Sequence, residues 1–137
     1  MALLQTILYG VNIQSLRGST EIEVTGLQID SRKVRPGDCF IAIKGTSSDG
    51  HQFIDAAIAN GALSVICETI PGDVNDQVHY VAVENSTKAA GVIAHTFYGR
   101  VTEKMKLIGV TGTNGKTTIA TLLFQLFSSL GYECGLI

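Results

Sequence analysis

The sequence has little of several features that would each indicate a particular class of protein. Its 137 residues carry 10 basic and 12 acidic side chains, so no excess of positive charge favours nucleic acid or a membrane surface as a partner. No apolar run approaches the length of a membrane span. The first residues lack the basic start and the small-residue cleavage site of a signal peptide. These absences predict a globular protein of the cytoplasm.

Cysteine is also sparse. Cys39, Cys67 and Cys134 are far apart and form no Cys-x-x-Cys pair, which excludes the usual zinc and redox motifs. Cys39 and Cys67 fall in strand-like runs, so we expect them to be reduced residues of the core.

The most informative stretch is 106–118, Lys-Leu-Ile-Gly-Val-Thr-Gly-Thr-Asn-Gly-Lys-Thr-Thr. The apolar run 107–110 predicts a buried parallel strand, and apolar residues at helical spacing after Lys116 predict an amphipathic helix that ends near Gly131. A glycine-rich turn between the two presents backbone amides to a phosphate. Lys116 would reach the β- and γ-phosphates and Thr117 would bind Mg²⁺, so the stretch predicts ATP or GTP chemistry.

The general phosphate-loop consensus, G-x-x-x-x-G-K-[ST], is nevertheless not met. Val110 stands where the consensus has its first glycine. An ordinary glycine-rich turn is therefore the alternative from these residues alone. The order of strand, Gly-Thr-Asn-Gly-Lys-Thr and helix favours phosphate binding.

The residues before this loop predict a small α/β unit over 1–84. We expect strands at 21–30, 39–43, 64–67 and 79–83, with a bend at Gly26. We expect a short N-terminal helix with Leu3, Leu4, Ile7 and Leu8 inward, a helix that buries Phe53, Ile54, Ala57 and Ile58, and a helix at 86–98 capped by Ser86. This last helix could pack on either side of the boundary. Residues 85–137 would then begin a second unit, which stops where a further strand is expected.

Two polar loops follow neighbouring strands of the first unit. Asp30-Ser31-Arg32 comes after one strand, and residues 44–51 come after the next. Loops at the ends of adjacent strands can form a pocket for an anionic ligand, although each loop by itself is also ordinary turn chemistry.

Taken together, these segments resemble the Mur ligase family. The resemblance rests on Asp30–Asp38, Phe40–Gly45, Asp49–Ile54, Ala57–Ala62 and Val110–Thr118, and it covers nearly the whole chain. Gly-Thr-Asn-Gly-Lys-Thr is the family's own form of the phosphate loop, which accounts for Val110. The chain is most similar to the MurE group, whose members add meso-diaminopimelate or L-lysine to UDP-N-acetylmuramoyl-L-alanyl-D-glutamate. The MurF group, which adds D-alanyl-D-alanine, is the nearest alternative.

The resemblance implies that the two parts of the chain bind different ligands. Residues 1–84 would bind the UDP-sugar, and residues 85–137 would form a linker helix and the start of a truncated, parallel-sheet ATP-binding domain. The implied substrate contacts are Ile29, Ser31, Gly45, Thr46, Ser47 and Ser48. The implied ATP contacts are Gly112, Thr113, Asn114, Gly115, Lys116, Thr117 and Thr118, with Lys116 catalytic and Thr117 supplying part of a Mg²⁺ site.

The implied reaction is ATP-dependent amide-bond formation through an acyl phosphate, with the UDP-sugar dipeptide and a diamino acid as substrates. The other Mg²⁺ ligands and the modified lysine typical of the family fall outside these residues, so we expect the 137-residue chain alone to be inactive. We expect a full-length monomer and self-association of the fragment. A non-catalytic UDP-sugar-binding relative, or a related ligase acting on folylpolyglutamate or cyanophycin, is the remaining alternative.

Overall fold

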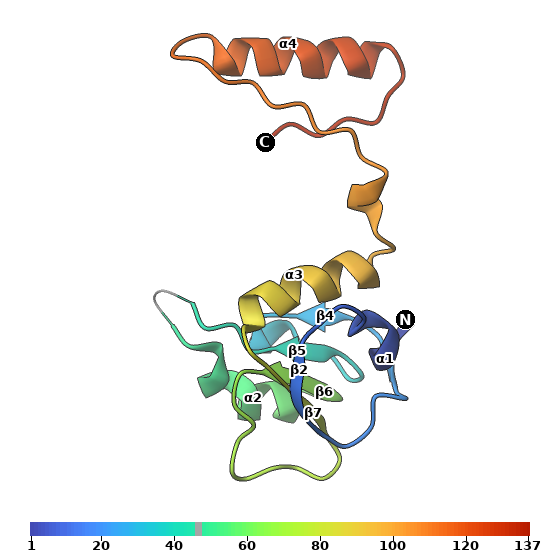
Figure 1. Cartoon of the computed structure of the whole chain (residues 1–137), viewed down its shortest axis with the longest axis vertical. Coiled ribbons are helices and arrows are strands. Elements are labelled where there is room, and N and C mark those ends of the chain that lie inside the picture. The colour runs from blue at the N-terminus through green and yellow to red at the C-terminus, as the bar shows by residue number, and fades with distance from the viewer. Residues whose placement is uncertain (46–47) are drawn as a thin grey trace. The chain divides into compact units, whose positions relative to one another are not determined.

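The computed structural model describes residues 1–45 and 48–137 and divides the chain into two compact units, Met1–Lys104 and Met105–Ile137 (Figure 1). The strands of the first unit are β1 (Ala2–Leu3), β2 (Ile13–Arg17), β3 (Glu23–Val24), β4 (Leu27–Gln28), β5 (Cys39–Ile41), β6 (Ser64–Cys67) and β7 (His79–Val83). Its helices are α1 (Leu4–Ile7), α2 (Ile54–Ala59) and α3 (Ser86–Phe97), with short 3-10 helices η1 (Ser31–Lys33), η2 (Gly50–Phe53) and η3 (Val101–Glu103). The second unit contains α4 (Lys116–Ser129).

A five-stranded sheet in the order β2-β7-β6-β5-β4 forms the centre of the first unit. Strands β4 to β7 are parallel, with Cys39 opposite Ser64 and Cys67 opposite Ala82, whereas β2 pairs antiparallel with β7. The short strands β1 and β3 form a separate antiparallel pair.

Helices cover both faces of this sheet, so the first unit has three layers (Figure 1). The side chains of a strand alternate between the two faces. Ile41, Ile66 and Val81 accordingly pack with α1 and α3 on one face, and Phe40, Val65 and Tyr80 pack with α2 on the other. Two apolar clusters therefore share one sheet, which explains why its central strands are continuous apolar runs.

The sequence predicted much of this unit, with several corrections. Strands 64–67 and 79–83 are confirmed, while the expected strand 21–30 is two short strands separated at Thr25–Gly26. Leu3 and Phe53 are exposed rather than inward. Asn85, not Ser86, caps α3, because its side chain accepts a hydrogen bond from the backbone N–H of Lys88 at 2.8 Å.

The extent of the first unit also differs from the predicted boundary at residue 84. Helix α3 buries Ala89 and Ile93 in the same apolar cluster as α1, and the compact unit runs on to Lys104. The helix at 86–98 thus belongs to the first unit, which settles the alternative that the sequence left open.

The second unit is built around α4 and has no buried residue anywhere in 105–137, all of which the structure describes. Residues 107–110, predicted as a buried strand, belong to no strand, and the Leu107 side chain is 91% exposed. The physical reason is that a strand needs a neighbour for its backbone hydrogen bonds, and the other residues of this unit form none. In the parts of the chain that are described, no helix is both long enough and apolar enough to cross a membrane.

Candidate functional site

The candidate site of the first unit lies at the carboxyl edge of its parallel strands. Because β4, β5, β6 and β7 run in one direction, the segments that follow them emerge at the same edge. In open parallel sheets this edge is where ligands commonly bind. The described segments are residues 29–33, 42–45, 48–51, 68–72 and 84–86, and they include the described parts of both predicted polar loops.

The Asp30-Ser31-Arg32 turn is held by one carboxylate. Asp30 accepts a hydrogen bond from the backbone N–H of Arg32 at 3.1 Å and two from its guanidinium, at 2.9 and 2.8 Å. The side-chain bonds from Arg32 are the largest cause that lowers the pKa of Asp30 to about 2. The same pair raises the pKa of Arg32. The charge of Arg32 is therefore already partnered within the turn.

The predicted substrate contacts differ widely in accessibility. Ser31 is only 7% exposed, and its carbonyl accepts from the Asn60 side-chain amide at 3.0 Å, so this turn is fixed against α2. Ile29, Gly45 and Ser48 are exposed, and the Gly45 N–H donates to the Ser48 carbonyl at 3.0 Å. Thr46 and Ser47 lie outside the described residues. The structure thus brings exposed Ile29 and Gly45 to one edge while leaving little of Ser31 accessible.

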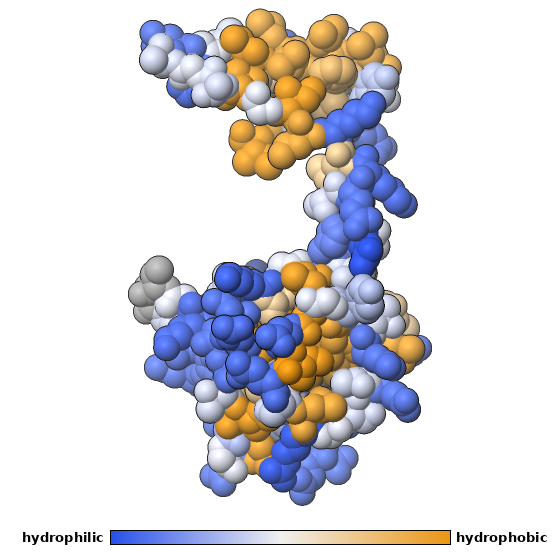
Figure 2. Space-filling model, viewed as in Figure 1, coloured by the Kyte–Doolittle hydropathy of each residue, from blue (hydrophilic) through white to orange (hydrophobic). Residues whose placement is uncertain are grey.

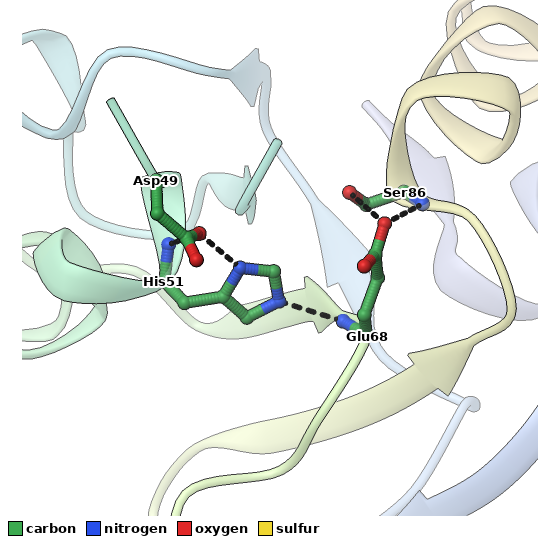
Figure 3. Close-up of polar contacts among 4 residues, drawn as sticks. All are labelled: Asp49, His51, Glu68 and Ser86. Carbon is green, nitrogen blue, oxygen red and sulfur yellow. Dashed lines mark hydrogen bonds and ion pairs between the residues drawn. The ribbon is translucent and has the colours of Figure 1, made fainter. Parts of the chain in front are cut away.

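The Asp49-Gly50-His51 motif closes the loop that follows β5 (Figure 3). The Asp49 carboxylate accepts from the His51 backbone N–H at 3.0 Å and lies 2.6 Å from His51 Nδ1. These bonds from His51 lower the pKa of Asp49, which keeps the carboxylate charged. Gly50 fits because a Cβ there would stand 2.7 Å from the backbone nitrogen and oxygen of Ile43.

The imidazole of His51 connects this loop to the end of β6, and the Glu68 side chain continues the connection to α3 (Figure 3). His51 Nε2 lies 2.8 Å from the Glu68 backbone nitrogen, and Glu68 Oε1 accepts from the backbone N–H and the hydroxyl of Ser86, both at 3.1 Å. A backbone N–H can only donate, so Nε2 must be an unprotonated acceptor. The proton of a neutral His51 is therefore on Nδ1, where it is donated to Asp49.

Two hollows lie beside these residues. One, of about 440 Å³, is lined by Lys44, Asp49, His51, Ile54, Glu68, Thr69, Ile70, Pro71 and Gly72. The other, of about 560 Å³, is lined by Thr25, Gly26, Gln28, Arg32, Lys33, Val34, Arg35 and Asp38. Of the predicted contacts that are described, Ile29, Ser31, Gly45 and Ser48, none lines either hollow.

The sequence reasoning missed Glu68 and Ser86 as parts of this edge. A signal was present, because Glu68 is the first charged residue after the apolar run of β6. A charged side chain directly after a buried parallel strand lies at the carboxyl edge, where its carboxylate can cap a helix.

The second unit carries the predicted phosphate loop before α4. Gly112 and Gly115 have φ values of +149° and +76°, which favour glycine, and Gly115 directly precedes the helix. The Lys116 ammonium donates to the carbonyls of Gly112 and Thr113. Thr113, Asn114, Thr117 and Thr118 are exposed, as are the two glycines and Lys116. A helix N-terminus, a lysine and a hydroxyl are the groups that bind a nucleotide phosphate and its metal ion.

Comparison with known proteins identifies the family. The sequence profile described as "Mur ligase family, catalytic domain" matches residues 23–98, which is more than half of the chain. The chain belongs to the Mur ligase family. A relative from Bacteroides thetaiotaomicron, UDP-N-acetylmuramoyl-L-alanyl-D-glutamate--2,6-diaminopimelate ligase, is 48% identical over 98% of this chain. The match covers 28% of that relative, so the chain spans little more than a quarter of its length.

Solved structures of Mur ligases share the fold of this chain. MurF from Acinetobacter baumannii has a TM-score of 0.70 and 25% identity, covering 93% of this chain and 27% of its own. A UDP-N-acetylmuramoyl-L-alanyl-D-glutamate--2,6-diaminopimelate ligase has a TM-score of 0.66 and 32% identity, and the match covers 97% of this chain and 26% of that ligase. MurF from Thermotoga maritima, solved in complex with ADP, has a TM-score of 0.54 and 34% identity, and the match covers 75% of this chain and 23% of that MurF.

Proposed function

We propose that this Mur ligase chain is the N-terminal part of an enzyme that adds diaminopimelate to UDP-N-acetylmuramoyl-L-alanyl-D-glutamate. The observation that carries the proposal is the 48% identity, along nearly the whole chain, to a ligase with that name. Relatives with that name favour diaminopimelate over L-lysine as the amino acid added. Since the chain spans 28% of that relative, we expect these 137 residues to bind substrate but not to complete the ligation.

The first unit would supply the site for the UDP-sugar. The residues expected to bind it are Ile29, Gly45 and Ser48, which are exposed, together with Ser31, Thr46 and Ser47. Exposed backbone amides and hydroxyls suit the oxygens of a nucleotide-linked sugar. Because Ser31 is nearly buried, we expect it to contact the ligand through the small accessible part of its surface. A soluble nucleotide-linked substrate also supports the cytoplasmic location expected from the sequence.

The second unit would supply part of the site for ATP. Residues 112–118 would surround the phosphates, with the Lys116 ammonium neutralising negative charge on the γ-phosphate and thereby favouring its transfer. The Thr117 hydroxyl, an oxygen donor on the first turn of α4, fits as one ligand of Mg²⁺, which would offset phosphate charge when bound. MurF from Thermotoga maritima, a Mur ligase with this fold, was solved in complex with ADP, which supports an adenine nucleotide as the ligand of the second unit.

A MurF-type ligase is the second candidate. The A. baumannii MurF has a higher TM-score than the solved diaminopimelate ligase, 0.70 against 0.66, which favours a MurF-type ligase on the fold. The A. baumannii MurF is 25% identical to this chain, whereas the diaminopimelate ligase from Bacteroides thetaiotaomicron is 48% identical. Sequence identity separates the two candidates better than the fold does, because both types of ligase share this fold.

Titration of the chain with UDP-N-acetylmuramoyl-L-alanyl-D-glutamate tests the proposal. We expect NMR shifts of the Ser31 and Gly45 amides, and about tenfold weaker binding for Ser31→Ala, which corresponds to the loss of about one hydrogen bond. Thr87→Ala, at an exposed position of α3, is the matched control and should bind like the wild type. An absence of shifts near Ser31, or ATP-dependent ligation by the 137-residue chain alone, would contradict the proposal.

A further inference from the structure

The backbone remains bonded to α3 for two residues beyond the end of that helix. The Gly99 N–H donates to the Thr96 carbonyl at 3.1 Å, and the Arg100 N–H donates to the His95 carbonyl at 2.8 Å. With Gly99 at a φ of +77°, these two bonds form the Schellman motif, which commonly ends a helix at a glycine. The chain is therefore held to α3 as far as Arg100.

Arg100 has a backbone conformation that is unfavourable for an arginine. Its φ of +55° and ψ of +40° lie in the left-handed region, which residues other than glycine seldom occupy. Among the residues that the structure describes, it is the one residue other than glycine with a positive φ. Such a conformation persists only where the surrounding contacts determine it. Contacts beyond Arg100 must therefore hold this turn in place.

His95, in the last turn of α3, makes those contacts with the 3-10 helix η3. The Thr102 hydroxyl lies 2.7 Å from His95 Nδ1. Oε1 of Glu103 lies 3.4 Å from His95 Nε2 and 3.4 Å from a guanidinium nitrogen of Arg100. A carboxylate can only accept, so Nε2 carries a proton, and a neutral ring then accepts from the Thr102 hydroxyl through Nδ1. Side chains thus bond η3 back to α3.

The backbone of η3 does not make this connection. Its two bonds, from Glu103 to Arg100 and from Lys104 to Val101, both at 3.1 Å, close η3 on itself. In the parts of the chain that are described, no backbone hydrogen bond joins residues 101–104 to α3 or to the sheet. The position of η3 on the helix therefore depends on side-chain contacts.

The restraint on the chain ends at Lys104. Residues 105–114 make no backbone–backbone hydrogen bond with any residue that the structure describes, and none of them is buried. The first compact unit also ends at Lys104. Segments with few backbone bonds and little burial are the ones that open most easily. A change from held to free chain is therefore expected directly after η3.

We propose that the His95 cluster, made of His95, Arg100, Thr102 and Glu103, turns η3 into a rigid extension of α3, so that the flexible joint between the two units begins at Met105 and not at the end of the helix. The cluster is a positioning device and takes no part in chemistry. The proposal does not rest on the identity of any ligand. In the proposed ligase, the extension would give the segment that carries the phosphate loop a fixed point of attachment.

Residual dipolar couplings of the 137-residue chain locate the joint, because one set of alignment parameters describes one rigid body. At a concentration at which the chain is monomeric, the N–H couplings of residues 99–104 should fit the parameters of the first unit. Those of residues 116–129 should require parameters of their own. Couplings of residues 99–104 that do not fit the first unit would overturn the proposal, and so would a single set of parameters that fits both units.

Limited digestion with trypsin tests the cluster itself, because the enzyme can cut after Arg100, Lys104 and Lys106 and needs an open segment of chain. Mass spectrometry identifies each cut. Each rate is divided by the rate for the matching free peptide, which removes any effect of a substitution on the protease. In the wild type, the cut after Lys106 should be more than tenfold faster than the cut after Arg100. Equal rates at these two sites would contradict a rigid η3.

Substitutions at Thr102 isolate the short bond to His95. Thr102→Val removes the hydroxyl and keeps the branched shape, and it should speed the cut after Arg100 about fivefold, the effect of losing one hydrogen bond. Thr102→Ser keeps the hydroxyl and should behave like the wild type. Thr87→Val, the same change at an exposed position of α3, is the matched control and should also leave the rate unchanged.

His95→Leu removes both contacts of the imidazole and should speed the cut after Arg100 at least fivefold. Leucine favours a helix more than histidine does, so faster cutting would not come from a weaker α3. The cut after Lys106 should keep its wild-type rate in all four variants. Wild-type rates after Arg100 in both Thr102→Val and His95→Leu would show that the His95 cluster does not hold η3.

Discussion

Gly50 illustrates how a single position determines the shape of the candidate site. An added Cβ would stand 2.7 Å from two backbone atoms of Ile43, just beyond β5, and backbone atoms cannot move aside as the end of a flexible side chain can. We expect Gly50→Ala to destabilise the first unit by about 2 kcal/mol, as overpacking usually does. Unfolding of the variant in urea measures this change.

Gly91 provides the control for that substitution. It lies within α3 with no atom within 4 Å of the position of an added Cβ, so alanine is free to raise helix propensity. Gly91→Ala should stabilise the unit by about 0.5–1 kcal/mol. Equal stability losses for the two alanine variants would contradict the steric argument.

The three thiols should differ sharply in reactivity. Burial raises the pKa of Cys39 to about 12 and that of Cys67 to about 11, whereas Cys134 is exposed. Since the thiolate is the reactive form, a thiol reagent at about pH 8 should label Cys134 rapidly and the other two only after unfolding. Rapid labelling that persists in Cys134→Ser would contradict this assignment.

The same burial gives the first unit an alkaline limit of stability. The folded-state pKa of Cys39 lies above its ordinary value of 9.0, so the folded chain holds this proton longer than the unfolded chain. The contribution of the buried Cys39 thiol to the free energy of unfolding is therefore fully present below pH 9.0 and declines as the pH rises towards about 12. Urea unfolding of the wild type and of Cys39→Ala across this range measures it, and parallel pH profiles for the two would contradict it.

At the scale of elements, α3 depends on a cap that the sequence analysis placed one residue late. Asn85 bonds the Lys88 N–H, and Glu68 bonds Ser86 in the same turn. We expect Asn85→Ala to destabilise the first unit by about 1 kcal/mol. Thr87→Ala, in the same turn, should change stability by less than about 0.5 kcal/mol. Urea unfolding compares the two, and equal effects would show that the Asn85 cap contributes little.

The elements that could be predicted are those with a clear periodicity. Residues 64–67 and 79–83 are short apolar runs, as expected of strands covered on both faces, and both are strands. Strand β2 was missed because its apolar residues, Ile13 and Leu16, do not alternate. A register shift between Ile13 and Ser15 explains this spacing, and β2 lies exposed at the edge of the sheet. Sequence periodicity cannot reveal a strand that pairs through an irregular register.

At the scale of the whole molecule, the candidate site was predictable only in part. The sequence identified the loops that gather at the carboxyl edge, because each follows a recognisable strand. It did not identify the contact between His51 and Glu68, which joins residues from different loops through a backbone N–H. Nor did it show that Ser31 is nearly buried, because that depends on how η1 packs against α2. Long-range contacts of this kind follow from the sheet order rather than from a local pattern.

The second unit leads to a prediction about the behaviour of the chain in solution. Figure 2 shows apolar residues gathered over this unit, and Leu107, Ile108, Ile119, Leu122 and Leu126 are each about half exposed or more. Monomeric proteins rarely leave large apolar patches in water, and a helix without packing partners is only marginally stable. We therefore expect the 137-residue chain to self-associate through α4 as its concentration rises.

Sedimentation equilibrium of matched α4 variants tests this expectation. Leu122→Glu combined with Leu126→Glu places charges on the apolar face and should keep the chain monomeric at about 0.1–1 mM. Gln125→Glu adds one charge at an exposed polar position of the same helix and should associate like the wild type. A wild type that stays monomeric over this range would show that α4 does not drive association. Equal dissociation of both variants would show that net charge, rather than the apolar face, controls it.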